Sequence, residues 1–171
     1  ITVSAALDSG AANLKDTFSC NGYSQVGGYK IKCHKVGGHG SNFSLAYGLQ
    51  MSCNPCMIAI SERLGAERFY SYAEAFGYFE KSGIDLPGEG TTIFHRLENM
   101  GSTELATASF GQRFKVSIIN QLVAISAVAN GGKLVRPYVV DKVIDSNGKI
   151  ISEHKTEVRK QVISEEVANT V

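Results

Sequence analysis

The sequence predicts an α+β fold. Apolar or amphipathic segments at residues 54–65, 66–76 and 116–132 predict helices, and a stretch rich in Val and Ile around Asn147-Gly148 predicts a hairpin of strands. At 171 residues the chain is long enough for a substantial core, because a chain of about this size buries roughly two thirds of its unfolded surface. We therefore expect one domain, or most of one, that combines a helical region with sheet strands.

The first third of the chain predicts a helix end followed by a hairpin. Residues 1–10 are typical of the second half of a helix that closes at Gly10. Residues 18–33 predict a hairpin, and a four-residue loop at 25–28 would place Cys20 directly opposite Cys33. Because opposed strand positions lie within disulfide reach, we expect these two cysteines to form a disulfide when the protein matures outside the cytoplasm.

Two consecutive helices are predicted in the next segment. Apolar spacing predicts a helix over residues 43–51, with Ser41 or Asn42 as its N-cap. A second helix is expected to begin at once, with Asn54 as N-cap, Pro55 at the first helical position, and an end at Gly65. Ser52 and Cys53 then occupy the short turn between the two helices.

The remaining elements follow from apolar patterns and turn residues. A third helix is expected over residues 66–76, and the Gly- and Pro-containing segment 83–90 is expected to be loop or short strand. Segment 116–132 is apolar on nearly every face and predicts a helix buried inside the domain. Residues 138–145 and 149–152 predict strands of the central sheet, and Ser164 is expected to begin a last helix.

The distribution of charged and apolar residues argues against nucleic acid and membrane as partners of this chain. The chain carries 17 basic and 16 acidic residues, a net charge of +1, with no basic run that would follow phosphates, so we expect no nucleic acid partner. No apolar run approaches the roughly 20 residues that cross a bilayer, and the start lacks signal-peptide features. We expect any membrane anchor or export signal to lie outside this chain.

The stretch MSCNPC, residues 51–56, allows several interpretations. In the simplest, Asn54 caps a helix and Ser52 is an exposed turn residue. A thioredoxin-like interpretation uses Cys53 and Cys56 as a reactive pair at a helix N-terminus, where the dipole lowers a thiol pKa, but the expected preceding strand is missing.

A metal interpretation draws on the other cysteines and histidines. Zinc accepts these ligand types, and the candidates are Cys20, Cys33, His34 or His39, Cys53 and Cys56. Against it, the chain has one close C-x-x-C pair, and the predicted hairpin already offers Cys20 and Cys33 to each other. His39, between glycines, is more typical of a loop residue than of a catalytic base.

The order of several motifs resembles the transpeptidase domain of class B penicillin-binding proteins, and most closely the division and sporulation-specific enzymes of Gram-positive spore formers. These motifs are AALDSG, the cysteine-containing hairpin, GHG, SCNP, RLGAERFY, AFGYFEKSGIDLPGE, ELATASFGQ and AVANGGKLVRPYVV. The resemblance covers nearly the whole chain. One departure lies after FGQ, where the family commonly has V-T-P-L-Q and this chain has Val116 followed by Ser117, Ile118, Ile119 and Asn120.

The resemblance implies a partial transpeptidase fold of the β-lactamase and DD-peptidase type. It places the S-x-x-K motif, with the nucleophilic serine and its lysine, before Ile1, and the K-T-G motif beyond Val171. Residues 1–171 are then a single incomplete transpeptidase domain, which we expect to be inactive alone. Ser52-Cys53-Asn54 falls on the remaining motif, S-x-N.

The resemblance also implies a function for the intact protein. That function is serine-type D,D-transpeptidation, which cross-links peptidoglycan stem peptides, binds β-lactams and needs no metal or organic cofactor. Ser52 would relay a proton and Asn54 would orient the substrate amide, although capping by Asn54 remains open. The implied location is the outer face of the cell membrane, among the cell-wall synthesis machinery. The alternatives are a non-catalytic β-lactam or peptide sensor of the same fold, and a structural cysteine or zinc module.

Overall fold

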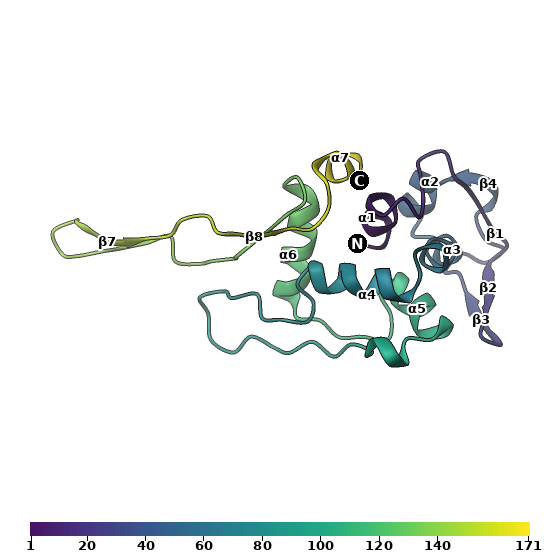
Figure 1. Ribbon diagram of the computed structural model, residues 1–171, viewed down its shortest axis with the longest axis horizontal. Helices are drawn as coiled ribbons and strands as arrows, with labels where there is room; N and C mark the ends of the chain where they lie inside the picture. Colours follow the sequence, from purple (N-terminus) through teal and green to yellow (C-terminus); the bar gives the residue numbers. More distant parts are fainter.

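The computed structural model describes all 171 residues as helices joined by small antiparallel sheets (Figure 1). The helices are α1 (Thr2–Asp8), α2 (Leu45–Gln50), α3 (Asn54–Leu64), α4 (Ala66–Ala75), the 3-10 helix η1 (Leu97–Asn99), α5 (Ser102–Ser109), α6 (Ile118–Ala129) and α7 (Glu165–Thr170). The strands are β1 (Thr17–Cys20), β2 (Tyr23–Val26), β3 (Tyr29–Lys32), β4 (Gly40–Ser44), β5 (Lys133–Val135), β6 (Lys142–Ile144), β7 (Ile150–Glu153) and β8 (Val158–Gln161).

Helices occupy the middle of the molecule, and the sheets lie at its two ends (Figure 1). Helix α3 packs against α1, α4 and α5, and it contacts strands β1, β2 and β3. At the opposite end, β5 and β8 lead to the hairpin β6–β7, which projects away from the helices. Helix α7 packs against α1, so the two chain ends lie near each other.

The hairpin near the N-terminus differs in register from the prediction. Strands β2 and β3 pair Tyr23 with Lys32 and Val26 with Tyr29, which leaves a two-residue turn at Gly27-Gly28. Both glycines have positive φ, 54° and 82°, and this conformation permits the tight turn in place of a four-residue loop. The predicted opposition of Cys20 and Cys33 is therefore wrong.

Cys20 instead belongs to a different sheet. It ends β1, which pairs with β4, and its register partner is Gly40. Phe43 lies in β4, where its side chain is buried, so α2 begins later than the apolar spacing predicts. The N-cap is Ser44, whose Oγ accepts from the backbone N–H of Tyr47 at 3.2 Å, and not Ser41 or Asn42.

Other helix ends agree with the sequence. Gly65 and Gly77, with φ of 80° and 82°, follow α3 and α4, as expected for glycine at a helix end. Ser164 caps α7 by accepting from the backbone N–H of Val167. Helix α1 closes before Gly10, which has a φ of 71°.

Helix α6 is buried on one side only, so the prediction of a fully buried helix is wrong. Val123, Ala124 and Ala127 are buried with side chains of α4 and α7. On the other side, Ile118, Leu122 and Ile125 are 89%, 56% and 55% exposed. The helix contacts β5 and α7 along one flank, and no element covers its outer face.

The strands after Tyr138 form no central sheet, which corrects a second expectation. Strand β6 pairs only with β7, around the turn at Asn147-Gly148, and β5 pairs only with β8. The hairpin itself was predicted correctly. It projects into solvent because each of its strands has a single neighbour, which leaves its Val and Ile side chains exposed.

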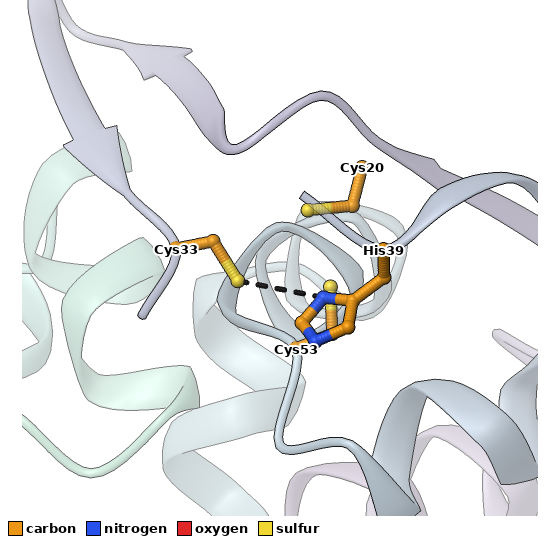
Figure 2. A group of neighbouring side chains, drawn as sticks. All are labelled: Cys20, Cys33, His39 and Cys53. Atoms are coloured by element: carbon orange, nitrogen blue, oxygen red, sulfur yellow. Dashed lines mark hydrogen bonds between the residues drawn. The ribbon is translucent and has the colours of Figure 1, made fainter. Parts of the chain in front are cut away.

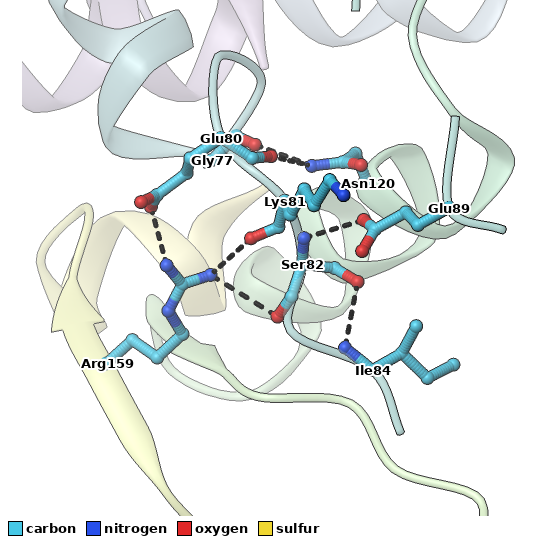
Figure 3. A network of polar contacts seen from close by, with 8 residues as sticks. All are labelled: Gly77, Glu80, Lys81, Ser82, Ile84, Glu89, Asn120 and Arg159. Carbon is cyan, nitrogen blue, oxygen red and sulfur yellow. Dashed lines mark hydrogen bonds and ion pairs between the residues drawn. The ribbon is translucent and has the colours of Figure 1, made fainter. Parts of the chain in front are cut away.

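A polar network fixes the segment that follows α4 (Figure 3). The side chain of Asn120 in α6 donates to the carbonyl oxygens of Gly77 and Glu80, at 2.7 and 2.8 Å. Arg159 in β8 pairs with the Glu80 carboxylate at 2.8 Å and points toward the carbonyl oxygens of Lys81 and Ser82. These contacts tie α6, β8 and the loop after α4 into one unit.

Candidate functional site

The short turn between α2 and α3 presents Ser52 at the surface. Ser52 is exposed and has a φ of 49°, a left-handed conformation that side chains other than glycine rarely adopt. Its backbone N–H donates to the carbonyl oxygen of Leu49, and that of Cys53 donates to Gly48, each at 2.9 Å. The α2 terminus thus holds the turn by backbone hydrogen bonds, as predicted for a helix junction.

Ser52 lines a pocket of about 230 Å³ that also contains both ends of the chain. The lining residues are Ile1, Thr2, Val3, Leu49, Ser52, Met57, Ser109, Phe110 and Val171. Thr2 donates from Oγ1 to the carbonyl oxygen of Ser109 at 2.7 Å, which joins α1 to the end of α5. Sequence spacing alone gives no signal that residues 109–110 would reach this pocket.

Asn54 does not cap α3, so the capping interpretation of MSCNPC is wrong. The N-cap position is Cys53, and no side chain accepts a hydrogen bond there. Asn54 is half-buried, and its Nδ2 donates to the carbonyl oxygen of Lys32 at 3.0 Å, which joins α3 to the end of β3. Asn54 is not among the residues that line the Ser52 pocket.

Three cysteines and one histidine meet just behind this turn (Figure 2). The ligand atoms of Cys20, Cys33, His39 and Cys53, which we call the thiol cluster, all lie within 4.8 Å of one another. All four residues are buried, and the cysteines are free thiols. One of the two sequence arguments against a metal assumed a Cys20–Cys33 strand pair, and the observed register removes it.

Two other candidate ligands lie outside the thiol cluster. His34 is exposed, with Nδ1 3.9 Å from the Cys33 Sγ. The side chain of Cys56 faces Gly48, where an added Cβ would meet its Sγ at 2.4 Å. Cys56 is therefore a packing residue of α3 that requires a glycine opposite it.

Burial and hydrogen bonding shift the pKa values of the thiols in different directions. Burial raises the pKa of both Cys53 and Cys56 to about 12, which contradicts the thioredoxin-like interpretation of a low-pKa thiol. Burial also acts to raise the pKa of Cys20, but hydrogen bonds from the backbone N–H groups of Gly22 and His39 and from neighbouring thiols outweigh it. The net pKa of Cys20 is lowered.

The S-x-x-K spacing occurs twice, at residues 146–149 and 152–155. The first match lies at the turn of the β6–β7 hairpin and the second begins in β7, at the far end of the molecule from α2 and α3 (Figure 1). Neither match lies on a helix, where residues three apart would share one face.

Known proteins resemble this chain over most or all of its length. A family model described as the penicillin binding protein transpeptidase domain matches residues 1–171. Stage V sporulation protein D of Bacillus subtilis is 43% identical over 173 residues, which cover 100% of this chain and 27% of that protein. A peptidoglycan D,D-transpeptidase FtsI homolog of Mesostigma viride is 26% identical over 142 residues, which cover 81% of this chain and 23% of that protein. The chain thus spans about a quarter of the length of these curated relatives.

Solved structures share the fold. A crystal structure of penicillin binding protein 3 from Mycobacterium tuberculosis complexed with ampicillin matches with a TM-score of 0.88 at 23% identity. The match covers 99% of this chain and 37% of that one, and it confirms the α+β transpeptidase fold. No helix here combines the length and apolar character needed to cross a bilayer.

Proposed function

The chain belongs to the transpeptidase domain family of penicillin-binding proteins, and from this we propose that it is the S-x-N-bearing part of a serine-type peptidoglycan D,D-transpeptidase. In this reaction a serine attacks a stem-peptide carbonyl and D-alanine leaves with a proton. The amine of a neighbouring stem peptide then takes the acyl group and releases the serine. Residues 1–171 form one incomplete domain of this enzyme.

One observation carries the proposal: Ile1, Ser52 and Val171 line the same pocket. The family resemblance places S-x-x-K directly before the helix that opens at Ile1, and K-T-G beyond Val171. The pocket is therefore where three motifs, distant in sequence, would converge. Such convergence is the requirement for a nucleophile, its base and a substrate-binding strand to act together.

Ser52 is suited to move a proton in this pocket. A hydroxyl both donates and accepts, so it can pass a proton between the lysine of S-x-x-K and the leaving or incoming amine. The backbone hydrogen bonds of the turn hold Ser52 in place, and its Oγ has no partner within the chain. Asn54 would orient the substrate amide with Oδ1, since its Nδ2 is used by Lys32.

The proposal extends to location and partners. Stem peptides are the acyl donor and acceptor, and β-lactams acylate the same serine. The intact protein would act at the outer face of the membrane with the cell-wall synthesis machinery, anchored by a segment outside this chain. The relative named for stage V of sporulation supports a sporulation role.

Substitution of Ser52 in the full-length protein tests this function. Ser52→Ala should slow acylation by a labelled penicillin and by a stem-peptide substrate by about a hundredfold to ten-thousandfold, the range for a positioned acid or base. Ser146→Ala, in the remote hairpin turn, is the matched control and should react like the wild type. Unchanged acylation in Ser52→Ala would contradict the proton-relay role. An acyl-enzyme that forms but is never transferred to an amine would indicate a sensor.

A further inference from the structure

The thiol cluster gathers its side chains from four separate segments. Cys20 ends β1, Cys33 directly follows β3, His39 directly precedes β4, and Cys53 occupies the N-cap of α3. Figure 2 shows the three sulfur atoms and the imidazole pointing toward one another. We propose that the thiol cluster binds one structural zinc ion.

The spacing of the ligand atoms fits a tetrahedral site. With zinc–sulfur bonds of about 2.3 Å and a zinc–nitrogen bond of about 2.0 Å, neighbouring ligand atoms lie roughly 3.6–3.8 Å apart. Cys33 Sγ and His39 Nδ1 are already 3.6 Å apart, and no pair in the thiol cluster exceeds 4.8 Å. Each separation therefore needs to contract by about 1 Å at most, which side-chain rotation can supply.

The ligand chemistry selects zinc and a structural role. Three cysteines with one histidine form one of the common structural zinc sets, whereas magnesium and calcium require oxygen ligands that this group lacks. All four coordination positions are filled by protein. Because the cysteines are 8% exposed or less and His39 is 9% exposed, the site offers no open position for a substrate.

The buried imidazole of His39 turns one ring nitrogen toward the thiols. Its Nδ1 lies 3.6 Å from the Cys33 Sγ, a sulfur that makes only a weak hydrogen bond, and this is the nitrogen that the contact offers to a metal ion. A buried polar group with only a weak partner is costly. A disulfide would use two of the sulfurs and leave the imidazole unpaired, whereas a zinc ion uses all four side chains.

The position of Cys53 links this metal to the neighbouring turn. Cys53 lies between Ser52 and Asn54, so a zinc ion would tie their turn to β1 and to the connection between β3 and β4. The metal would then restrain the left-handed backbone of Ser52. This role concerns folding and positioning, and it does not depend on the transpeptidase activity proposed above.

Metal analysis of the full-length protein tests the proposal. Protein purified without added metal should contain about one zinc ion per chain, as measured by inductively coupled plasma mass spectrometry. Cys20→Ser, Cys33→Ser and His39→Gln should each lose most of this zinc. The matched controls are Cys56→Ser and His34→Gln, which change the same residue types just outside the thiol cluster and should keep the wild-type content.

A second measurement on the wild type covers the case in which the ligand variants fail to fold. Cobalt(II) exchanged into the wild-type protein should give the absorption bands of a tetrahedral thiolate site, and chelation should lower the melting temperature. Wild-type protein that contains no zinc and does not bind cobalt would overturn the proposal, as would a Cys20–Cys33 disulfide in the folded protein. Full zinc content in all three ligand variants would overturn it as well.

Discussion

The side chain of Asn54 has two candidate roles, one structural and one in substrate binding. Its Nδ2 donates to the Lys32 carbonyl oxygen, so half of the carboxamide already holds β3 against the start of α3. The other half, Oδ1, has no partner within the chain and could accept from a substrate amide. The two roles use different atoms, and substitutions that remove one atom at a time can separate them.

We expect Asn54→Asp and Asn54→Ala to reduce both stability and reactivity in the full-length protein. Loss of the donor to Lys32 should cost about 1–2 kcal/mol of unfolding free energy, measured by urea denaturation. If Oδ1 also orients a substrate amide, Asn54→Ala should slow acylation of the folded protein by about 5- to 150-fold, equivalent to about 1–3 kcal/mol. Asn54→Asp keeps an acceptor oxygen and should retain more of the rate.

Asn99→Asp, at the exposed 3-10 helix η1, is the matched control for the charge change. A stability loss with wild-type acylation in both Asn54 variants would mean that Asn54 is a structural link only.

At the residue level the sequence predicted the turn but not the thiol cluster. Ser52 and Cys53 follow from helix signals on both sides, which are local, and the structure confirms their turn. The thiol cluster depends on the Cys20–Gly40 pairing within the β1–β4 sheet and on the burial of His39 in a glycine-rich loop. Sequence spacing does not determine either feature, because both arise from tertiary packing.

Among the elements, α1, α4 and α7 are joined through the carboxylate of Asp8. Its Oδ2 accepts from the hydroxyl of Tyr72 in α4, and its Oδ1 accepts from the backbone N–H of Ser164 at the N-cap of α7, both at 2.7 Å. Burial acts to raise the pKa of Asp8, but the hydrogen bonds from Ser164 and Tyr72 outweigh it, and the net pKa is lowered from its ordinary value of 3.8.

The Asp8 carboxylate should make the free energy of unfolding depend on pH. A lowered pKa in the folded state means that the unfolded chain binds the proton first, so the contribution of Asp8 is present above pH 3.8 and is lost as the pH falls below that value. At pH 7 we expect Asp8→Asn to reduce the unfolding free energy by about 1–2 kcal/mol. Both partners of Asp8 are donors, and the NH2 group of the new carboxamide would face one of them. The difference from the wild type should shrink below pH 3.8.

Urea denaturation between pH 2.5 and pH 7, conditions chosen to span about one unit or more on each side of the ordinary aspartate pKa, measures this effect. Asp141→Asn, an exposed position with no side-chain partner, is the matched control. An equal destabilisation by Asp8→Asn at both pH extremes would contradict a role for its charge.

Helix boundaries were more predictable than strand pairing, for a physical reason. Gly65, Gly77 and Ser164 act through local backbone conformation and capping, which the sequence encodes directly. The β2–β3 register depends on which turn Gly27-Gly28 adopts, and the pairing of β1 with β4 spans more than twenty residues. The register of such strands depends on which of their side chains the core buries.

On the scale of the whole molecule, helix α6 presents an uncovered apolar face. An apolar helix face with Ile118, Leu122 and Ile125 uncovered is unusual for a helix that the sequence predicts to be buried. The prediction failed because apolar composition alone does not determine which side of a helix the core covers. The chain spans about a quarter of the length of these curated relatives.

We predict that residues 1–171 alone form no covalent adduct with a labelled penicillin. The pocket brings Ser52 together with Ile1 and Val171, but an acyl-enzyme needs a nucleophile activated by an adjacent base, and the pocket contains no lysine to activate a serine. Intact-mass spectrometry after incubation should show an unchanged mass, whereas the full-length protein should gain one penicillin per chain. The chain with Ser146→Ala and the chain with Ser152→Ala test the two S-x-x-K matches. A stoichiometric adduct on the wild-type chain that disappears in one of these variants would place the nucleophile in the β6–β7 hairpin. An adduct that persists in both would show that another side chain of residues 1–171 is the nucleophile.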